Sequence, residues 1–531
     1  MSLPQLTLGL RLGDLNSASF QRLYLYRQLC NLQHNTSFSF NHRTTNDQTD
    51  RPSLPSRPVA HQSGTTCIAI DQTQGRYLVS GGADTAIRFW DLDAPHHEHD
   101  NEDDTKTHFQ PVSSLSKANP AAHSHAITSI SIYPHDPTPS TLLSTSFDTA
   151  LLVTALTPTS LIPVHRFPLD HAVYTHALSP HASSPTSSLI AAGTAHPSVR
   201  LLDLRSGLST HSLPGHQGSI WTLTWHPRHT QTLLSAGTDG RILFFDIRRA
   251  APAFASLHAD DSLGILSDPS RPLLSYTHRA HSGPITGITF VPDSGSSSSS
   301  SSDLLLSASH DSRLRVWNTS TLANRLAHFG PRIRNSRTGN LAPLSAPATT
   351  ACGEGTKRGA ELVFWPNDDG RGEIFVSTVR EGELVQVMQM QSNPREVSGR
   401  IGGKPGQMDK RDKTASQLTA AKRINTMAFR PVHASSASTN GGIELYTGHG
   451  DGSINLWTAS DIVGEEMSDT DTDADTCSDS GANAFVSRIG AGRGSRSRFR
   501  EDEDDEDQQR KKKRKREADL ARLVQGLSKR S

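Results

Sequence analysis

Residues 215–249 read GHQGSIWTLTWHPRHTQTLLSAGTDGRILFFDIRR. Three segments rich in β-branched and aromatic residues alternate there with turns at His226-Pro227 and Asp239-Gly240. This alternation predicts three antiparallel strands in succession. His216 precedes the first strand, and Ser235 lies in the second strand, four residues before the turn aspartate.

The same frame recurs along the chain. Each full copy has a histidine before the first strand and a serine four residues before the turn aspartate, and some copies add a tryptophan in the third strand. The members are His61, Ser80, Asp84 and Trp90; His123, Ser144 and Asp148; His216, Ser235 and Asp239; His281, Ser307, Asp311 and Trp317; and Asp451 with Trp457, where Thr447 takes the serine position.

One polar network explains why these residue types recur together. The turn aspartate accepts hydrogen bonds, the histidine reaches it from the preceding loop, and the serine and the indole N–H complete the chain. Such a network pins a four-stranded blade, and repeats of about 40–45 residues with this signature are WD repeats. Five clear repeats are joined by two degenerate ones, at 170–206, where His196 replaces the turn aspartate, and at about 347–390.

The repeats predict an all-β protein, a seven-bladed WD-repeat β-propeller over residues 58–460. Residues 1–45 are predicted to form an N-terminal helical arm, and residues 461–531 a disordered charged tail. Three low-complexity inserts are expected to be solvated loops. They are the His/Asp-rich 94–109, the serine run 294–302 and the Gly/Lys-rich 399–415.

The composition fits a chain that is only partly packed into a core. Of 531 residues 34% are hydrophobic, and 53 basic side chains balance 53 acidic ones. The balance conceals two opposite blocks, EDEDDED (501–507) and RKKKRKR (510–516), which favour disorder. The four cysteines are scattered, which argues against a disulfide framework or a zinc knuckle. The sequence shows no apolar run long enough to span a bilayer and no secretory leader, so no membrane association is expected.

No catalytic centre is predicted. The recurrent His, Ser and Asp residues resemble a nucleophilic triad in composition, but their repetition from blade to blade favours a structural role. HHEH (96–99) offers metal-ligating side chains, yet a solvated loop is the simpler interpretation. No Gly-rich phosphate loop follows a strand, so no nucleotide or other cofactor is predicted. Trp221 and Trp225 alternate on one strand, either packed between blades or forming a binding hot spot.

Two strand ends carry an Asp-x-Arg pattern, Asp203 with Arg205 and Asp246 with Arg248. An arginine two residues beyond the strand-closing aspartate projects at one rim of the propeller. There its planar fork suits a partner's carboxylate or backbone carbonyls. A local salt bridge is the alternative interpretation.

The run LNSASFQRLYLYRQLCNLQ (15–33) places apolar residues at helical spacing. It predicts an amphipathic helix with a cap at Asn16 or Ser17. The helix either folds back on the propeller or inserts into a partner's groove, in which case Leu23, Tyr26 and Leu29 would make the contact. The apolar residues are Phe20, Leu23, Leu25, Tyr26, Leu29 and Leu32.

The basic block predicts nuclear import and therefore a nuclear protein. A solvated charge run, or sequence-blind contact with nucleic acid, is the alternative. Its residues are Arg510, Lys511, Lys512, Lys513, Arg514, Lys515 and Arg516.

The sequences of several predicted strands and turns resemble those of the Cockayne syndrome A family of WD-repeat DNA-repair proteins. The resemblance covers roughly residues 10–460 and is densest over 60–250. The segments that carry it are GRYLVSGGADTAIRFWDL (75–92), YPHDPTPSTLLSTSFD (133–148), AVYTHALSP (172–180), GLSTHSLPGHQGSIWTLTWHPR (207–228) and LLSAGTDGRILFFDIRRA (233–250).

The resemblance implies a nuclear, non-catalytic substrate receptor of a cullin–RING ubiquitin ligase acting in transcription-coupled nucleotide-excision repair. It would bind the damaged-DNA-binding adaptor through the N-terminal arm and one rim. The opposite rim would face a Cockayne syndrome B-type ATPase at a stalled RNA polymerase II complex. By position, Asp246 and Arg248 match the family's docking motif, and Asp203 and Arg205 provide a second copy. Direct contact with DNA is left open.

The sequence departs from the family pattern at three places. Phe245 and Leu202 stand where the docking motif has a tryptophan, and the second blade closes on Thr154-Ala155. Two other hypotheses remain. The charged tail also suits a nuclear WD-repeat scaffold in chromatin or ribosome assembly. HHEH would suit a metal enzyme.

Overall fold

The computed structural model describes most of the repeat region and part of the N-terminus. The chain divides into two compact units, Met1–Ile462 and Val463–Ser531, and the second lies outside the described residues. The described residues are 17–42, 59–94, 96–99, 105–249, 253–257, 265–266, 279–291, 304–335, 341–346, 361–390, 422–431 and 443–459.

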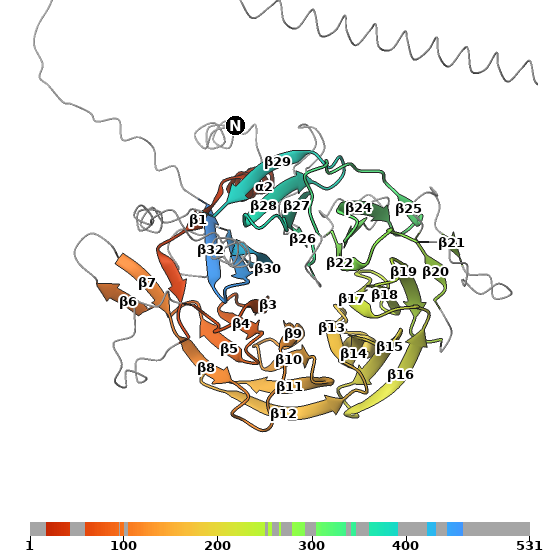
Figure 1. Cartoon of the computed structure of the whole chain (residues 1–531), viewed down its shortest axis with the longest axis horizontal. Helices are drawn as coiled ribbons and strands as arrows, with labels where there is room; N and C mark the ends of the chain where they lie inside the picture. The colour runs from red at the N-terminus through yellow and green to blue at the C-terminus, as the bar shows by residue number, and fades with distance from the viewer. Residues whose placement is uncertain are drawn as a thin grey trace, which may run out of the picture. The chain divides into compact units, whose positions relative to one another are not determined.

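Seven antiparallel sheets radiate around a central axis as the blades of a propeller (Figure 1). In six blades the sheet has four strands, and in blade 4 it has five. The predicted seven-bladed fold is confirmed, including the third and sixth blades, whose repeats are degenerate in sequence.

Blades 1 to 3 follow one another along the chain. Blade 1 consists of β3 (Thr65–Ile70), β4 (Tyr77–Gly82), β5 (Ile87–Asp91) and β8 (Pro111–Leu115). Blade 2 consists of β9 (Ile127–Ile132), β10 (Thr141–Ser146), β11 (Ala150–Leu156) and β12 (Leu161–Pro168). Blade 3 consists of β13 (Val173–Leu178), β14 (Leu189–Thr194), β15 (Ser198–Asp203) and β16 (Leu208–Pro214), with the 3-10 helix η2 (Pro185–Ser188) before β14.

Blades 4 to 7 complete the ring. Blade 4 consists of β17 (Ile220–Trp225), β18 (Thr232–Gly237), β19 (Ile242–Asp246), β20 (Ala255–Ser256) and β21 (Ile265–Leu266). Blade 5 consists of β22 (Ile285–Phe290), β23 (Leu304–Ser309), β24 (Arg313–Asn318) and β25 (Ala323–Asn324). Blade 6 consists of β26 (Leu344–Ser345), β27 (Leu362–Pro366), β28 (Glu373–Thr378) and β29 (Leu384–Gln389). Blade 7 consists of β30 (Ile424–Arg430), β31 (Glu444–His449), β32 (Ile454–Ala459) and, from the N-terminus, β1 (Leu32–Asn35).

The core lies between neighbouring blades. The middle strands are buried on both faces, which explains their nearly continuous apolar and small residues. Between blades 1 and 2, for example, Ile87 and Phe89 share one buried cluster with Ile127 and Leu142. Full burial of an aliphatic or phenylalanine side chain stabilises the fold by about 1.5–3 kcal/mol.

The two ends of the repeat region meet in blade 7. Strand β1 pairs antiparallel with β32 and sets Leu32 opposite Ala459 and His34 opposite Trp457. Helix α2 (Ser17–Cys30) precedes β1. The expectation that Leu32 continues the helix is wrong, because this residue pairs with the exposed edge of the last blade and is fully buried there.

The expectation of a solvated loop over 94–109 is wrong in part. Strands β6 (His96–His99) and β7 (Thr105–Phe109) form a hairpin, and β2 (Phe38–Phe40) adds to β7 in parallel. Phe40 and Phe109 anchor this small sheet, since both are buried and their rings stack at 4.8 Å between centroids. Backbone pairing and two buried aromatic rings therefore outweigh the polar composition of the insert. The inserts 294–302 and 399–415 lie outside the described residues.

Candidate functional site

Blades 1 and 5 contain the complete predicted network. In blade 5, His281 Nδ1 lies 3.0 Å from Asp311 Oδ2, and His281 Nε2 lies 2.7 Å from Ser307 Oγ. The Trp317 indole donates to the same serine oxygen at 2.8 Å. In blade 1 the matching distances, among His61, Asp84, Ser80 and Trp90, are 3.0, 2.8 and 2.9 Å.

Electrostatics and hydrogen bonding agree in blade 5. Burial lowers the pKa of His281 and outweighs the opposing effect of Asp311. For Asp311, burial disfavours the charged form, but the hydrogen bond that His281 donates and the charge of the nearby Arg315 keep its pKa below the usual range. A neutral His281 therefore donates from Nδ1 to an ionised Asp311 and accepts the Ser307 hydroxyl at Nε2.

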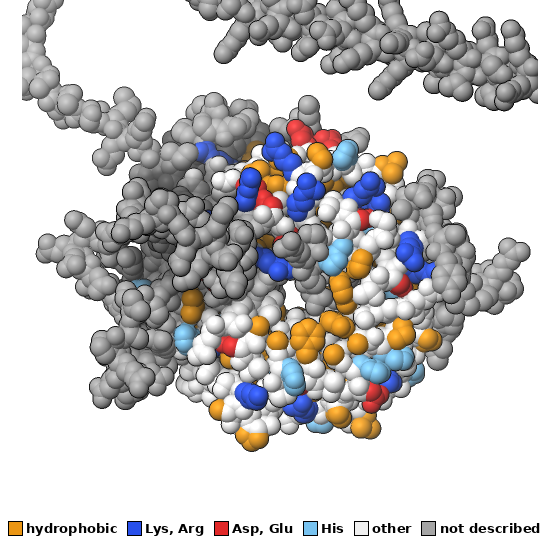
Figure 2. Space-filling view, in the orientation of Figure 1, with side chains coloured by type: hydrophobic (Ala, Val, Ile, Leu, Met, Phe, Trp, Pro, Cys, Tyr) orange, Lys and Arg blue, Asp and Glu red, His pale blue; other side chains and the backbone are white. Residues whose placement is uncertain are grey.

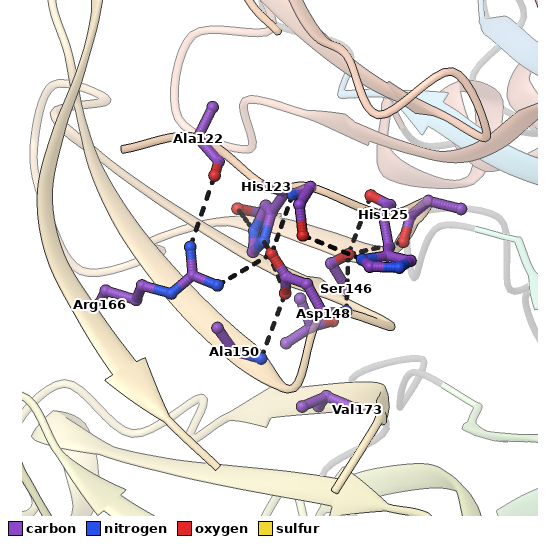
Figure 3. Close-up of polar contacts among 12 residues, drawn as sticks. Ala122, His123, His125, Ser146, Asp148, Ala150, Arg166 and Val173 are labelled. Atoms are coloured by element: carbon purple, nitrogen blue, oxygen red, sulfur yellow. Dashed lines mark hydrogen bonds and ion pairs between the residues drawn. The ribbon is translucent and has the colours of Figure 1, made fainter. Parts of the chain in front are cut away.

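Blades 2 and 4 keep the network without its tryptophan. His123 lies 3.0 Å from Asp148, and Arg166 donates to Asp148 at 3.1 Å (Figure 3). His123 also lies 2.9 Å from Ser144. Thr154 occupies the tryptophan position, where its buried hydroxyl has no hydrogen-bond partner.

Blade 4 shows the same substitution with an apolar residue. His216 lies 2.9 Å from Asp239 and 2.6 Å from Ser235, and the buried Phe245 takes the tryptophan position. Phenylalanine leaves no unpaired polar atom at this position, in contrast to Thr154.

Blade 7 rebuilds the network with a histidine from another element. Trp457 donates to Thr447 Oγ1 at 3.0 Å, and the ring of His449, a residue of β31, lies 2.8 Å from the same oxygen. In blade 1 the corresponding position is Gly82, where an added Cβ would collide with His61. A histidine from the strand thus fills the space that a loop histidine fills elsewhere. Asp451 accepts hydrogen bonds from the backbone and hydroxyl of Ser453.

These networks lie inside the blades, with their serine hydroxyls closed off from solvent. Ser80, Ser144, Ser235 and Ser307 have no exposed surface. A hydroxyl that is closed off from solvent cannot attack a substrate, so the geometry agrees with the structural interpretation of the recurrent His–Ser–Asp sets.

Both Asp-x-Arg corners lie on the rim opposite the network turns. Strand β19 runs from the Asp239 turn to Asp246, so the two aspartates stand at opposite ends of one strand. Arg248 donates to Asp246 from Nε at 3.0 Å and from Nη2 at 2.7 Å, while 67% of its side chain remains exposed. The local salt bridge is therefore present. In blade 3, Asp203 accepts the Arg205 backbone N–H at 3.0 Å, and the Arg205 side chain is exposed.

Helix α2 packs on the propeller's own side. Leu29 is fully buried in a cluster with residues of blades 6 and 7, and Tyr26 packs against that cluster while partly buried. Leu23 is partly exposed. In this conformation Leu29 is closed to a partner's groove. A docking role for Leu23 and Tyr26 stays a prediction, and the cap candidate Asn16 lies outside the described residues.

The innermost strands surround a central channel of about 490 Å³, which sequence reasoning did not identify. Trp221 and Tyr174 line it, whereas Trp225 is buried between blades and donates to the Ala177 carbonyl at 3.2 Å. The alternation of Trp221 and Trp225 thus separates a channel residue from a packing residue. Aligning the second residue of each inner strand would have revealed the channel lining.

Two predicted sites lie wholly or partly outside the described residues. Nothing is described of the basic block 510–516, so nuclear import stays a prediction. The backbone of HHEH forms β6, but its side chains are not described. Within the described ranges no group of three or more His, Cys, Asp or Glu side chains is placed to hold a metal ion. No helix in those ranges has the length and apolar character needed to cross a membrane.

Comparison with known proteins supports the repeat assignment. The WD40 family, described as WD domain, G-beta repeat, matches residues 55–91, 207–246 and 273–318. WD repeat-containing protein ATCSA-1 of Arabidopsis thaliana is 29% identical over 191 residues, which are 36% of this chain and 40% of that protein. Histone acetyltransferase type B subunit 2 of Debaryomyces hansenii is 29% identical over 113 residues, 20% of this chain and 25% of that protein.

These matches have a limited extent. The chain aligns with less than half the length of either relative. The protein carries WD40 repeats and folds as a seven-bladed β-propeller that is distantly similar to ATCSA-1.

Proposed function

We propose that this protein is a substrate-recognition subunit of a cullin–RING ubiquitin ligase that acts in transcription-coupled nucleotide-excision repair. The observation that carries the proposal is the pair of Asp-x-Arg corners on neighbouring blades of one rim, in a chain whose strands resemble the Cockayne syndrome A family. The similarity to WD repeat-containing protein ATCSA-1 also supports this proposal.

The geometry at Arg248 suits docking. A guanidinium has five N–H donors, and the two bonds to Asp246 use only two of them. Asp246 therefore fixes the plane of the fork and leaves three donors for a partner's carboxylate or carbonyl groups. Exposed arginines held in this way are common anchors of protein interfaces. In the proposal this rim binds the damaged-DNA-binding adaptor.

The remaining partners follow from the family resemblance. The opposite rim would meet a Cockayne syndrome B-type ATPase and the stalled RNA polymerase II complex, and the basic block 510–516 would direct the protein to the nucleus. Affinity purification with and without transcription-blocking damage tests this part. We expect adaptor and cullin in both samples and polymerase only after damage.

Charge reversal at both corners tests adaptor binding. The double variant Arg205→Glu and Arg248→Glu should lower adaptor capture at least about tenfold. The two introduced carboxylates would repel the adaptor carboxylates that the arginines are proposed to bind. The matched control is Lys117→Glu with Arg371→Glu, which changes net charge equally at two exposed positions away from these corners. Equal capture by the corner variant, the control and the unchanged protein would overturn the proposal.

A nuclear WD-repeat scaffold in chromatin or ribosome assembly is the second candidate. The similarity to a protein named histone acetyltransferase type B subunit 2, together with the acidic and basic blocks of the tail, favours it. On this alternative, histones or preribosomal particles would dominate a purification, and a deletion strain would survive ultraviolet light normally.

A further inference from the structure

The second residue of the innermost strand has a structural role in four blades. It projects into the channel and donates a hydrogen bond to a carbonyl of the next blade, so that neighbouring blades are tied together around the axis. These bonds are Thr66 to Ile127 at 2.7 Å, Thr128 to Val173 at 2.8 Å, Thr286 to Leu341 at 2.8 Å and Asn425 to Thr65 at 2.8 Å.

Blades 3 and 4 depart from this pattern. Tyr174 and Trp221 take the same position in β13 and β17, where these four blades have threonine or asparagine. The indole Nε1 of Trp221 has no hydrogen-bond partner, although the atom is buried. Two large rings thus replace small residues that tie blades together, which favours a role other than blade packing.

The two rings belong to a longer aromatic run. Phe147 from the β10–β11 turn meets Tyr174 at 5.7 Å between centroids, Tyr174 meets Trp221 at 6.3 Å, and Trp221 meets His310 at 5.5 Å. Residues 147 and 310 each precede a network aspartate, so the run follows the channel mouth from blade 2 to blade 5 on the rim away from the Asp-x-Arg corners. Figure 2 shows hydrophobic side chains gathered beside the central opening.

This run is accessible. Phe147 is 44% exposed, and Trp221 is the one tryptophan of six that is not buried, the other five being at most 3% exposed. The channel volume of about 490 Å³ lies in the range that binds small ligands and side chains of peptides. An accessible aromatic lining beside a cavity of this size suits a large apolar side chain.

The charge of the lining indicates the rest of the ligand. Among the described residues that line the channel, Arg423 is the only charged one, and none of them is a carboxylate. Its Nε lies 3.5 Å from Asp368, which offsets part of the charge. The lining therefore favours an acidic ligand over a basic one.

We propose that the channel mouth binds a linear, acidic segment of a partner protein, with an aromatic side chain inserted beside Phe147, Tyr174 and Trp221 and a carboxylate near Arg423. This site is separate from the proposed adaptor-docking rim, so either one stands if the other fails.

Intrinsic fluorescence of the full chain provides the test, because Trp221 is the one accessible indole. The probes are three defined twelve-residue peptide mixtures: phenylalanine among Asp and Glu, phenylalanine among Lys and Arg, and Asp and Glu without an aromatic residue. We expect the first mixture to change the fluorescence and to bind at least about tenfold more tightly than the other two.

The variants follow from the repeat itself. Trp221→Thr and Tyr174→Thr restore the residue that other blades carry, so we expect unchanged thermal stability and at least about tenfold weaker binding, followed with fluorescein-labelled peptide. Arg423→Gln should bind the acidic and basic phenylalanine mixtures equally well, while still binding the mixture without an aromatic residue more weakly. Leu208→Ala, an exposed apolar residue on β16, is the matched control and should bind as the unchanged protein does.

Two results would overturn the inference. One is equal or tighter binding of the basic mixture, or of single-stranded nucleic acid. The other is unchanged binding in both threonine variants. Adaptor capture measured on Trp221→Thr keeps the proposals apart, since a loss at the channel should leave the other rim intact.

Discussion

Blades 5 and 3 have the same four-stranded antiparallel architecture, but different residues hold their turns. Blade 5 joins His281, Ser307, Asp311 and Trp317 in a buried polar chain. Blade 3 has Ala192 and Leu202 at the serine and tryptophan positions, both fully buried, and His196 at the aspartate position.

In place of the His–Ser–Asp–Trp network, the ring of His196 stacks on His171 at the surface, at 5.2 Å between centroids, and its Nδ1 lies 2.8 Å from Ser198 Oγ. Blade 3 also contains a buried histidine, His176, whose ring lies 2.6 Å from Ser131 of blade 2. Blade 3 thus shows that the network is dispensable when its members are replaced together, because Ala192 and Leu202 leave no polar group unsatisfied at the serine and tryptophan positions. Removing one member of an intact network is a different change, since its partners stay buried.

The largest effect is expected where one member is removed from a complete network. His281→Ala removes the acceptor of the Ser307 hydroxyl and one donor to the ionised Asp311, so we expect the free energy of unfolding to fall by about 3 kcal/mol. His196→Ala in blade 3 is the matched change and should cost about 0.5 kcal/mol or less. Urea denaturation of both variants measures the contrast, and similar losses in the two blades would contradict the comparison.

We expect acid to lower the stability of the protein through a buried histidine in each of blades 3 and 5. Burial lowers the pKa of His176 to about 4 and also lowers the pKa of His281. In each case the unfolded chain binds the proton more readily, so stability is full above about pH 6.5 and falls as the pH drops toward the folded value. For His176 alone we expect a loss of about 2 kcal/mol between pH 7 and pH 5.

The lowered pKa of Asp311 acts in the same direction at lower pH. Its ionised form stabilises the fold above the ordinary aspartate range, and that contribution is lost on further acidification. Denaturation between pH 7 and pH 4 should give a shallower pH dependence for His176→Gln than for the unchanged protein. The exposed His211→Gln serves as the control, and an unaltered slope in His176→Gln would contradict the role of burial.

Blade 7 tests whether a histidine from a strand can replace the loop histidine of the complete networks. His449→Ala leaves the buried Thr447 hydroxyl with Trp457 but without the imidazole. We expect a loss of about 1.5 kcal/mol in the free energy of unfolding, measured in urea. A loss as small as that of His196→Ala would mean that His449 does not replace the loop histidine.

The smallest effect is expected in blade 2, with the opposite sign. Thr154 buries a hydroxyl that has no partner at the position of the missing tryptophan. Thr154→Val keeps the shape and removes this group, so we expect a gain of about 1 kcal/mol in stability. Thr145→Val is the control, because the Thr145 hydroxyl is hydrogen-bonded and its removal should not stabilise. A higher melting temperature in the control alone would reverse the interpretation.

Local pattern predicted the blades well because each blade is built from neighbouring strands. The intervals from His61 to Asp84 and from His281 to Asp311 were enough to place the turns that the structure shows. The segment ELVFW (361–365) identified blade 6, although none of the described residues of that blade forms a His–Ser–Asp network. Composition misled at 96–99, where pairing with β7 converts a polar insert into a strand.

Contacts between segments that are distant along the chain could not be predicted from the sequence. Leu32 and Ala459 are far apart in the chain and meet only when the ring closes, so no local periodicity marks β1 as a strand of blade 7. The sequence also did not predict that His449 takes part in the network of blade 7. Its replacement of a loop histidine depends on the space inside the blade.

The sequence by itself determined the number and order of the blades, since strand alternation and turn chemistry repeat within each unit of the chain. It also located the Asp-x-Arg corners, which follow directly from strand ends. Only the tertiary structure decided that Leu29 is buried against the propeller and that Phe147, Tyr174 and Trp221 gather at one channel mouth. Closure of the ring sets those positions, because it brings together side chains whose separation along the chain carries no information about their distance in space.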